Sequence, residues 1–202
     1  MRYRITPMIV ALDVDGILNS SLLAKISSNG NISRLLAQMP ILKKIALEIL
    51  EMGEVVFKAR YEMNDRMEKV CYNWDVPYVG IITDRSIHGL MTALGKNSYI
   101  LQRMSFVQVR KTIFGSVSKL CHGPELWETK SVKPDESVLY RLAEFAKSKD
   151  VPPHEVLVMD DDPEFRFMAK SRFGFMVYPD DTEDIEVREK YPLFRQRVIA
   201  PA

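Results

Sequence analysis

Segments with two different patterns of apolar residues follow one another along the chain, and one pattern is typical of strands and the other of helices. Short apolar runs without polar alternation, which are typical of strands buried on both faces, are clearest at residues 9–12 and 156–159. In all, strands are predicted at residues 9–12, 54–59, 77–83, 104–109, 156–159 and 174–178. Because helical patterns separate most of these strands, we expect an α/β fold, a Rossmann-like parallel sheet with helices on both faces.

The helices are predicted from apolar residues that recur every three or four positions and from capping residues at their ends. They are expected at residues 40–52, 62–74, 86–94, 135–147 and 163–171, with a further helical segment after Ser33. The recurring apolar residues of the first of these helices are Ile41, Ile45, Ile49 and Met52, and Gly53 closes it. Residues 111–132 predict a loop with one short helix, and the tail after residue 178 predicts a surface segment.

Two carboxylates follow the first strand directly. Alternation along the extended chain places Asp13 and Asp15 on the same side, with Val14 turned away and Gly16 behind them. Two like charges this close are costly unless a metal ion or a proton offsets them. A calcium loop or a plain turn is the alternative interpretation. A calcium loop needs further oxygen ligands at fixed spacing and a closing glutamate, whereas apolar residues follow here.

Polar residues also end two of the other buried strands. Thr83 ends the strand at 77–83, and the acids Asp160, Asp161 and Asp162 follow the strand at 156–159. In parallel α/β sheets the functional site lies beyond the carboxyl ends of the strands. These residues are therefore expected to meet the Asp13–Asp15 pair at one edge of the sheet.

Composition limits the partners more than the chemistry. The 202 residues include 28 Lys and Arg against 27 Asp and Glu, so the net charge of +1 gives no support for nucleic-acid binding. Two cysteines are too few for a disulfide framework. The sequence contains neither a signal-peptide pattern nor a run of about 18 apolar residues that could span a membrane. A cytoplasmic protein without a membrane partner is expected.

The motifs at the strand ends, taken in order, resemble those of the haloacid dehalogenase (HAD) superfamily. The segments that carry the resemblance are DVDGIL at 13–18, GIIT ending at Thr83, Lys133-Pro134 with Tyr140, and VLVMDDDPEF at 156–165. They are similar to the D-x-D-G-T-L, strand-Thr/Ser, lysine and D-D-S-P-E-N motifs of that family. The resemblance implies a phosphatase-type HAD hydrolase: a magnesium-dependent phosphohydrolase that cleaves a small phosphomonoester through an aspartyl-phosphate.

The resemblance also implies roles for individual residues. Asp13 would be the nucleophile, and Asp15 would protonate the leaving oxygen and then activate water. Thr83 would donate a hydrogen bond to the phosphate, and Lys133 would offset its charge. Lys130 is an alternative to Lys133.

A magnesium ion, the implied cofactor, would be held by Asp13, the backbone carbonyl of Asp15 and an acid from the run at 160–162. Asp161 is expected to be that ligand. Asp160 would lie just outside the metal, orienting a metal-bound water or holding the lysine. Asp162 would cap the helix that begins at Pro163.

Other activities within the family remain open. Asp15 favours a phosphatase or a phosphomutase, since dehalogenases and phosphonatases of the family lack an acid there. Ile17 stands where threonine is usual, and Phe165 stands where many members have Asp or Asn. These two departures favour the alternative of a catalytically weak HAD-fold binding protein.

The expected division of the chain depends on which strand lies second in the sheet. If it is the strand ending in Thr83, residues 1–18 and 78–202 form the core and residues 19–77 form a mainly helical cap that would exclude water and select the substrate. If it is residues 54–59 instead, Lys58 and Ala59 occupy the place of the hydroxyl. The insertion then shifts to 84–130, and Thr83 loses its role.

Overall fold

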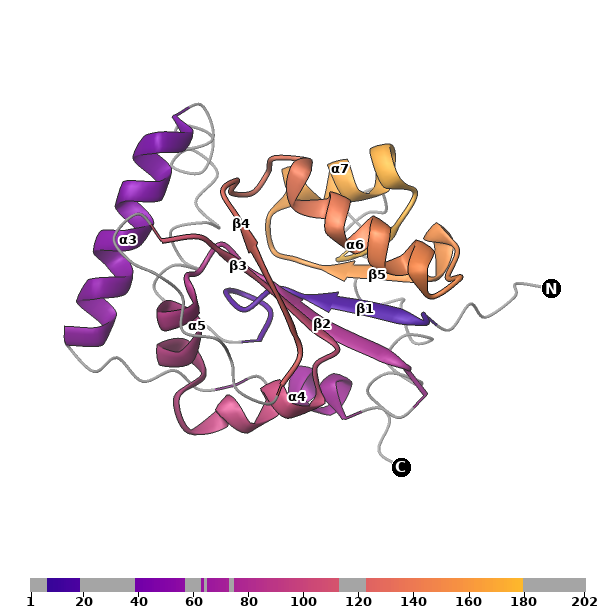
Figure 1. Cartoon of the computed structure of the whole chain (residues 1–202), viewed down its shortest axis with the longest axis horizontal. Helices are drawn as coiled ribbons and strands as arrows, with labels where there is room; N and C mark the ends of the chain where they lie inside the picture. Colours follow the sequence, from indigo (N-terminus) through magenta and orange to yellow (C-terminus); the bar gives the residue numbers. More distant parts are fainter. Residues whose placement is uncertain are drawn as a thin grey trace.

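The computed structural model describes residues 7–18, 39–56, 63, 65–72, 75–112 and 123–179 (Figure 1). Within these residues six strands form one sheet in the order β4-β3-β2-β1-β5-β6, and all neighbouring strands run parallel. The strands are β1 (Ile9–Leu12), β2 (Tyr78–Ile82), β3 (Phe106–Arg110), β4 (Glu125–Thr129), β5 (Val156–Met159) and β6 (Met176–Tyr178). The prediction of a Rossmann-like parallel sheet is confirmed.

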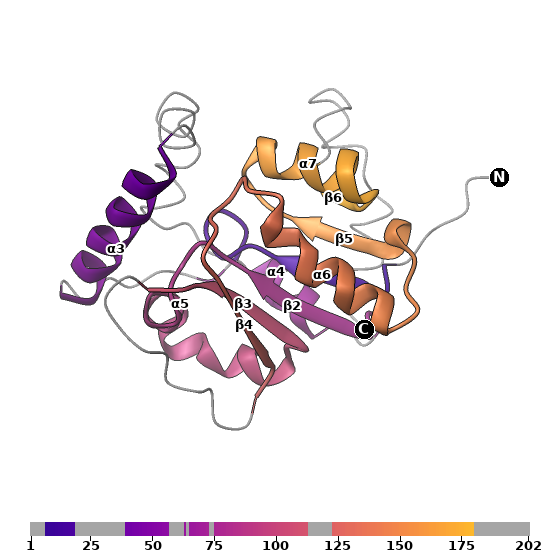
Figure 2. The same ribbon diagram turned by 45° about the horizontal axis from the view of Figure 1, so that its top comes forward.

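Helices cover both faces of this sheet (Figures 1 and 2). They are α3 (Pro40–Val56), α4 (Asp65–Cys71), α5 (Ile87–Leu94), α6 (Ser137–Ser148) and α7 (Pro163–Phe173), with short 3₁₀ helices η1 (Gly95–Arg103) and η2 (Pro153–Glu155). One apolar core joins the sheet to α4, α5 and η1, and a second joins it to α6 and α7. None of the helices in the described ranges is both long and apolar enough to cross a membrane.

The central strand β1 shows why an uninterrupted apolar run forms here. Val10 and Leu12 belong to one core, and Ile9 and Ala11 belong to the other. Successive side chains of a strand point to opposite faces, so a strand covered on both faces needs an apolar residue at every position. All four residues of β1 are buried.

The edge strand β4 was not predicted, because its residues lie in a segment that reads as loop. Glu125 and Glu128 are exposed, Leu126 and Thr129 are partly exposed, and only Trp127 is buried. The Trp127 ring stacks on Phe106 of β3, with ring centroids 4.6 Å apart. An edge strand with exposed glutamates lacks the apolar run that identifies a central strand.

The predicted strand at residues 54–59 is wrong at 54–56, because α3 continues past Gly53 to Val56. Residues 57–59 lie outside the described part of the chain, as do the helical segment after Ser33 and the tail after Pro179. The strand beside β1 on this side is β2, which Thr83 follows. The described portion of residues 19–77 is largely helical, and its assignment as a cap stays a prediction.

Helix α3 turns its acidic side inward and its apolar side outward. Glu48, Glu51 and Glu54 are buried, whereas Ile41 and Ile49 are 72% and 59% exposed. The helix stands beyond the carboxyl ends of the strands (Figure 2). Its acids meet Arg85 and Arg110, which follow or end β2 and β3. The apolar repeat therefore predicted the position of the helix correctly. It does not indicate the side that packs against the rest of the protein, because that side carries the glutamates.

Candidate functional site

Backbone hydrogen bonds carry the sheet one residue past its strands and so fix the site residues in place. Asp13 N donates to the Met159 carbonyl at 2.8 Å, and Thr83 N donates to the Gln108 carbonyl at 3.1 Å. Asp160 N likewise donates to the Tyr178 carbonyl at 3.1 Å. The side chains that follow β1, β2 and β5 are therefore held at one edge of the sheet.

Lys133 bridges two of these acids from the loop before α6. Its Nζ lies 2.8 Å from Asp13 Oδ1 and 2.6 Å from Asp160 Oδ2. The lysine is only 4% exposed, and its ammonium lies 5.1 Å from the centre of the Phe165 ring. The buried Phe165 ring thus makes a cation–π contact with the Lys133 ammonium. Lys130, the alternative from the sequence, is exposed after β4.

Three carboxylates converge beside this lysine. Asp13, Asp160 and Asp161 each offer an oxygen, and these oxygens all lie within 4.8 Å of one another. Gly16 makes room for Asp161, because a Cβ at this glycine would lie 2.5 Å from Asp161 Oδ2. Its φ of +84° is also strained for any residue with a side chain. The glycine of the D-x-D-G segment is therefore needed to leave space for the side chain of Asp161.

The three acids after β5 differ in their contacts. Asp160 accepts from the backbone N–H of Asp162 at 2.9 Å through Oδ1, while its Oδ2 faces Lys133. Asp162 accepts from the backbone N–H groups of Glu164 and Phe165 and caps α7, as predicted. Asp161 is partly exposed and belongs to the carboxylate cluster. Asp160 thus contacts Lys133 and the Asp162 backbone, whereas Asp161 is the more exposed of the two acids.

The charges in the cluster oppose one another strongly. Burial raises the pKa of Asp13 well above its ordinary value, Lys133 opposes this, and the neighbouring acids add to it. Burial raises the pKa of Asp161 to about 7, with the Asp160 carboxylate as the next cause. Burial alone would lower the pKa of Lys133, but Asp13 and Asp160 outweigh it and hold that pKa well above the ordinary value. The cluster thus contains one ammonium and three carboxylates, and a bound cation would offset the surplus of negative charge.

Asp15, the second acid of the D-x-D segment, is paired with a residue that the sequence analysis missed. Arg85 donates from Nε and Nη2 to the two oxygens of Asp15, each at 2.8 Å. The arginine is fully buried, and its backbone N–H donates to Thr83 Oγ1 at 3.2 Å. Arg85 lies two residues after Thr83, and this position near the end of a core strand was the only sign in the sequence that it belongs to the site. That position does not reveal that its partner is Asp15.

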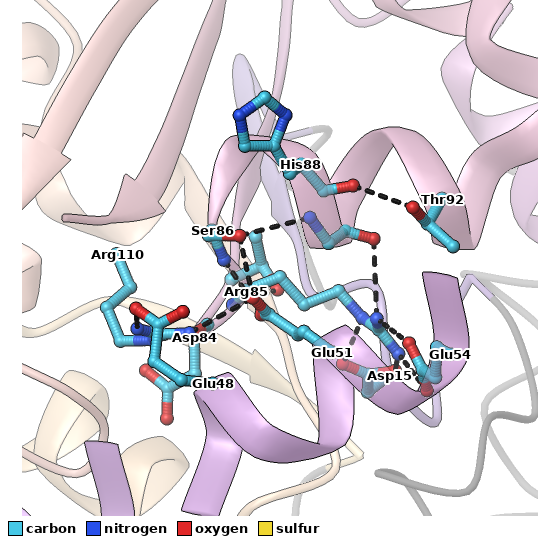
Figure 3. A network of polar contacts seen from close by, with 12 residues as sticks. Asp15, Glu48, Glu51, Glu54, Asp84, Arg85, Ser86, His88, Thr92 and Arg110 are labelled. Atoms are coloured by element: carbon cyan, nitrogen blue, oxygen red, sulfur yellow. Dashed lines mark hydrogen bonds and ion pairs between the residues drawn. The ribbon is translucent and has the colours of Figure 1, made fainter. Parts of the chain in front are cut away.

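Arg85 belongs to a larger network that fastens α3 to the sheet edge (Figure 3). Glu54 accepts from Arg85, and Glu51 accepts from the backbone N–H and hydroxyl of Ser86. Arg110 pairs with Glu48 at 2.6 Å and with Glu51 at 3.1 Å. A spacing of three residues places the three glutamates on one side of the helix.

The first half of α3 reaches the loop of Lys133. Lys43 Nζ lies 2.9 Å from Asp84 Oδ2 and also donates to the Lys133 carbonyl. Asp84 Oδ1 in turn accepts from the backbone N–H of Lys133 at 2.8 Å. Helix α3 therefore contacts the segments that carry Thr83 and Lys133.

The fold resembles that of several solved structures. A candidate phosphoglycolate phosphatase from Lactobacillus plantarum is 12% identical over 85% of each chain, with a TM-score of 0.52. A protein from Porphyromonas gingivalis described as an HAD-like family hydrolase is 14% identical over 94% of this chain and 98% of its own, with a TM-score of 0.52. A dehalogenase is 14% identical over 93% and 96%, with a TM-score of 0.51.

Identities this low show the fold alone. The chain has the fold of the HAD superfamily, and the resemblance drawn from its motifs is confirmed at that level. No protein-family model matches the sequence, and no curated protein matches it significantly. The neighbours include both a dehalogenase and a candidate phosphatase, so the shared fold does not identify a reaction.

The motif resemblance implies that Thr83 donates a hydrogen bond to a substrate phosphate, and replacing the residue tests this role. We expect Thr83→Val to lower kcat/KM for a phosphomonoester by roughly tenfold, the scale of one lost hydrogen bond to a charged group. Thr129→Val is the matched control, since Thr129 ends β4 at the edge of the sheet and its hydroxyl also accepts from a backbone N–H two residues on. Equal losses in the two variants would contradict the role of Thr83.

Proposed function

We propose that this chain is a magnesium-dependent phosphohydrolase that cleaves a small phosphomonoester through an aspartyl-phosphate on Asp13. The observation that carries the proposal is the grouping of Asp13, Asp160, Asp161 and Lys133 at the carboxyl edge of an HAD-type sheet. The motif resemblance and the shared fold support the same conclusion. Asp15 favours phosphoryl transfer over dehalogenation, because family dehalogenases lack an acid at that position.

The proposed reaction uses two carboxylates in turn. An oxygen of Asp13 attacks phosphorus, the bond from phosphorus to the ester oxygen breaks, and Asp15 gives its proton to the departing oxygen. Asp15 then takes a proton from water as that water attacks the aspartyl-phosphate. Inorganic phosphate leaves and Asp13 is restored. Lys133 and Thr83 would hold the phosphate oxygens throughout.

The acids present fit a magnesium ion. Mg²⁺ prefers hard oxygen ligands and is usually held by one or two carboxylates, waters and a substrate phosphate. Asp13 and Asp161 would be the carboxylate ligands, together with the backbone carbonyl of Asp15. When bound, the ion would offset negative charge on the transferring group and orient it.

Magnesium should stabilise the protein more at pH 8 than at pH 6. The pKa of Asp161 rises from an ordinary 3.8 to about 7 in the folded protein. Its proton therefore adds to the free energy of unfolding at low pH, and this contribution is lost as pH rises through about 7. Only the ionised acid binds metal well. We expect Mg²⁺ to raise the melting temperature by roughly a few degrees at pH 8 and by less at pH 6.

Two variants separate the acids in this measurement. Asp161→Asn should remove most of the stabilisation by Mg²⁺ and raise the magnesium concentration needed for activity. Asp160→Asn should have a smaller effect on both, since the oxygens of Asp160 hold Lys133 and the Asp162 backbone. The reverse ranking would show that Asp160 is the ligand.

The direct test of the proposed function is hydrolysis of p-nitrophenyl phosphate with and without Mg²⁺, followed by a set of phosphorylated metabolites. Release of inorganic phosphate that requires the metal is expected. Chloride release from a 2-chloro acid, measured in parallel, would favour a dehalogenase instead. Transfer of the phosphate within the substrate without net release would favour a phosphomutase.

A further inference from the structure

We propose that Arg85 is a positioning residue for Asp15 and that Glu54 of α3 holds Arg85 in its working orientation. The inference rests on the proposed function, since it assigns Asp15 an acid–base task. It goes further in making the efficiency of that task depend on a helix that lies outside the strand-end motifs. Glu54, Arg85 and Asp15 would form one buried chain of hydrogen bonds from α3 to the reacting atoms.

The geometry of Arg85 supports this chain of contacts (Figure 3). One edge of the guanidinium, Nε and Nη2, meets both oxygens of Asp15 at 2.8 Å. Nη1 donates to Glu54 Oε2 at 2.5 Å, and Nη2 also donates to Glu54 Oε1 at 3.2 Å. Nη1 donates further to the Gly89 carbonyl at 3.3 Å. The planar guanidinium therefore cannot rotate without breaking contacts on both sides.

Burial makes the arrangement specific. Arg85 is fully buried, and Glu54 is 6% exposed. A buried arginine that loses one partner keeps its charge, so it must move toward another acid or toward water. Removing Glu54 would therefore disturb the contact of Arg85 with Asp15.

The contact with Arg85 leaves Asp15 able to react. Each carboxylate oxygen has two accepting directions and the bidentate contact uses one on each oxygen, so this contact does not by itself block protonation of Asp15. Fixing the carboxylate plane also removes rotations that would point the acid away from the leaving oxygen. Loss of such alignment by about 1 Å can cost on the order of a hundredfold in rate.

Glu51 provides a matched control on the same helix. It is also buried and also carries a carboxylate, but it accepts from Ser86 and pairs with Arg110. Glu51→Gln should weaken the docking of α3 but leaves in place the hydrogen bonds from the Arg85 guanidinium to Glu54, so it should disturb the contact of Arg85 with Asp15 less than Glu54→Gln does. A difference between Glu54→Gln and Glu51→Gln therefore reports on Asp15 and not on the helix as a whole.

The experiment compares kcat/KM for two substrates with different leaving groups, in the presence of Mg²⁺. An alkyl phosphate needs a proton from Asp15 to release its alcohol, whereas p-nitrophenol leaves without one. We expect Glu54→Gln to lower kcat/KM for the alkyl phosphate by about tenfold and for p-nitrophenyl phosphate by less than about twofold. Glu51→Gln should change both substrates by the same factor. Arg85→Lys, which keeps the charge but loses the bidentate contact, should behave like Glu54→Gln.

A second arm repeats Glu54→Gln in an Asp15→Asn background, where no further selective loss against the alkyl phosphate is expected. A selective loss that persists there would overturn the inference, since Glu54 would then act by another route. Equal effects of Glu54→Gln and Glu51→Gln on both substrates would also overturn it, and would leave the phosphatase assignment standing. A wild-type protein that cleaves neither substrate would instead overturn the proposed function, and the inference with it.

Discussion

Asp13→Asn should abolish turnover while leaving the protein folded. The amide matches the carboxylate in size but cannot form an aspartyl-phosphate, and loss of a nucleophile that acts within a unit costs roughly 10⁴-fold or more. Burial already raises the pKa of the Asp13 carboxyl well above its ordinary value, and Lys133 keeps its ion pair with Asp160 in the variant, so the protein should stay folded. The measurement is the initial rate of phosphate release together with the melting temperature.

The control is the same chemical change at Asp162, which lies near the cluster but caps α7. Asparagine caps helices about as well as aspartate, so Asp162→Asn should keep both activity and melting temperature close to those of the wild type. Residual activity above about one part in a thousand, in an Asp13→Asn preparation shown by mass spectrometry to be free of deamidated protein, would exclude the covalent route. Incubation under conditions that deamidate asparagine should in turn restore activity.

The sequence predicted the parts of the fold whose signal is local. The runs that form β1 and β5 are apolar at every position, because a central parallel strand is covered on both sides. Helix α7 begins at Pro163 behind the capping Asp162, as those two residues indicate. The placement of Asp13, Thr83 and Asp160 at one edge follows from the rule that parallel strands end together.

The contacts that could not be predicted join segments far apart in the chain. Arg85 pairs with residues 70 and 31 positions away, and nothing adjacent to it in sequence indicates either partner. The orientation of helix α3 could not be predicted either, because the side that carries its regular apolar repeat is exposed. Buried glutamates are rare unless paired, so their inward orientation becomes apparent only when Arg85 and Arg110 are in place. Phe165, which stands where many members of the family have Asp or Asn, packs its ring against the ammonium of Lys133, a contact that the sequence did not indicate.

Lys133→Ala should have the second largest effect, on stability as well as on activity. The lysine lies between Asp13 and Asp160, so its removal leaves two buried carboxylates without their cation. Breaking a buried ion pair in this way costs roughly 3–5 kcal/mol of unfolding free energy. Loss of one charged group at a developing anion lowers the rate by about 10²–10³-fold.

The pH dependence of the loss in stability identifies its cause. Lys133 lowers the pKa values of Asp13 and Asp160, against the effect of burial. Without it these pKa values rise further, so both acids keep their protons to a higher pH in the folded variant than in the wild type, and the loss in stability should be smaller at pH 5 than at pH 8. As pH increases toward 8 the folded state must either keep its protons or bury two unpaired charges, and the loss should grow. Chemical denaturation of wild type and variant at pH 5 and pH 8 measures this difference.

Lys130→Ala is the control, since it removes the same type of side chain from an exposed position three residues earlier. We expect it to change the free energy of unfolding by less than about 0.5 kcal/mol at either pH, as is usual for surface substitutions. Its kcat/KM should stay within about twofold of the wild type, because Lys130 lies outside the carboxylate cluster. A loss of activity in Lys130→Ala equal to that in Lys133→Ala would show that the loop as a whole, and not the buried ammonium, is what the reaction requires.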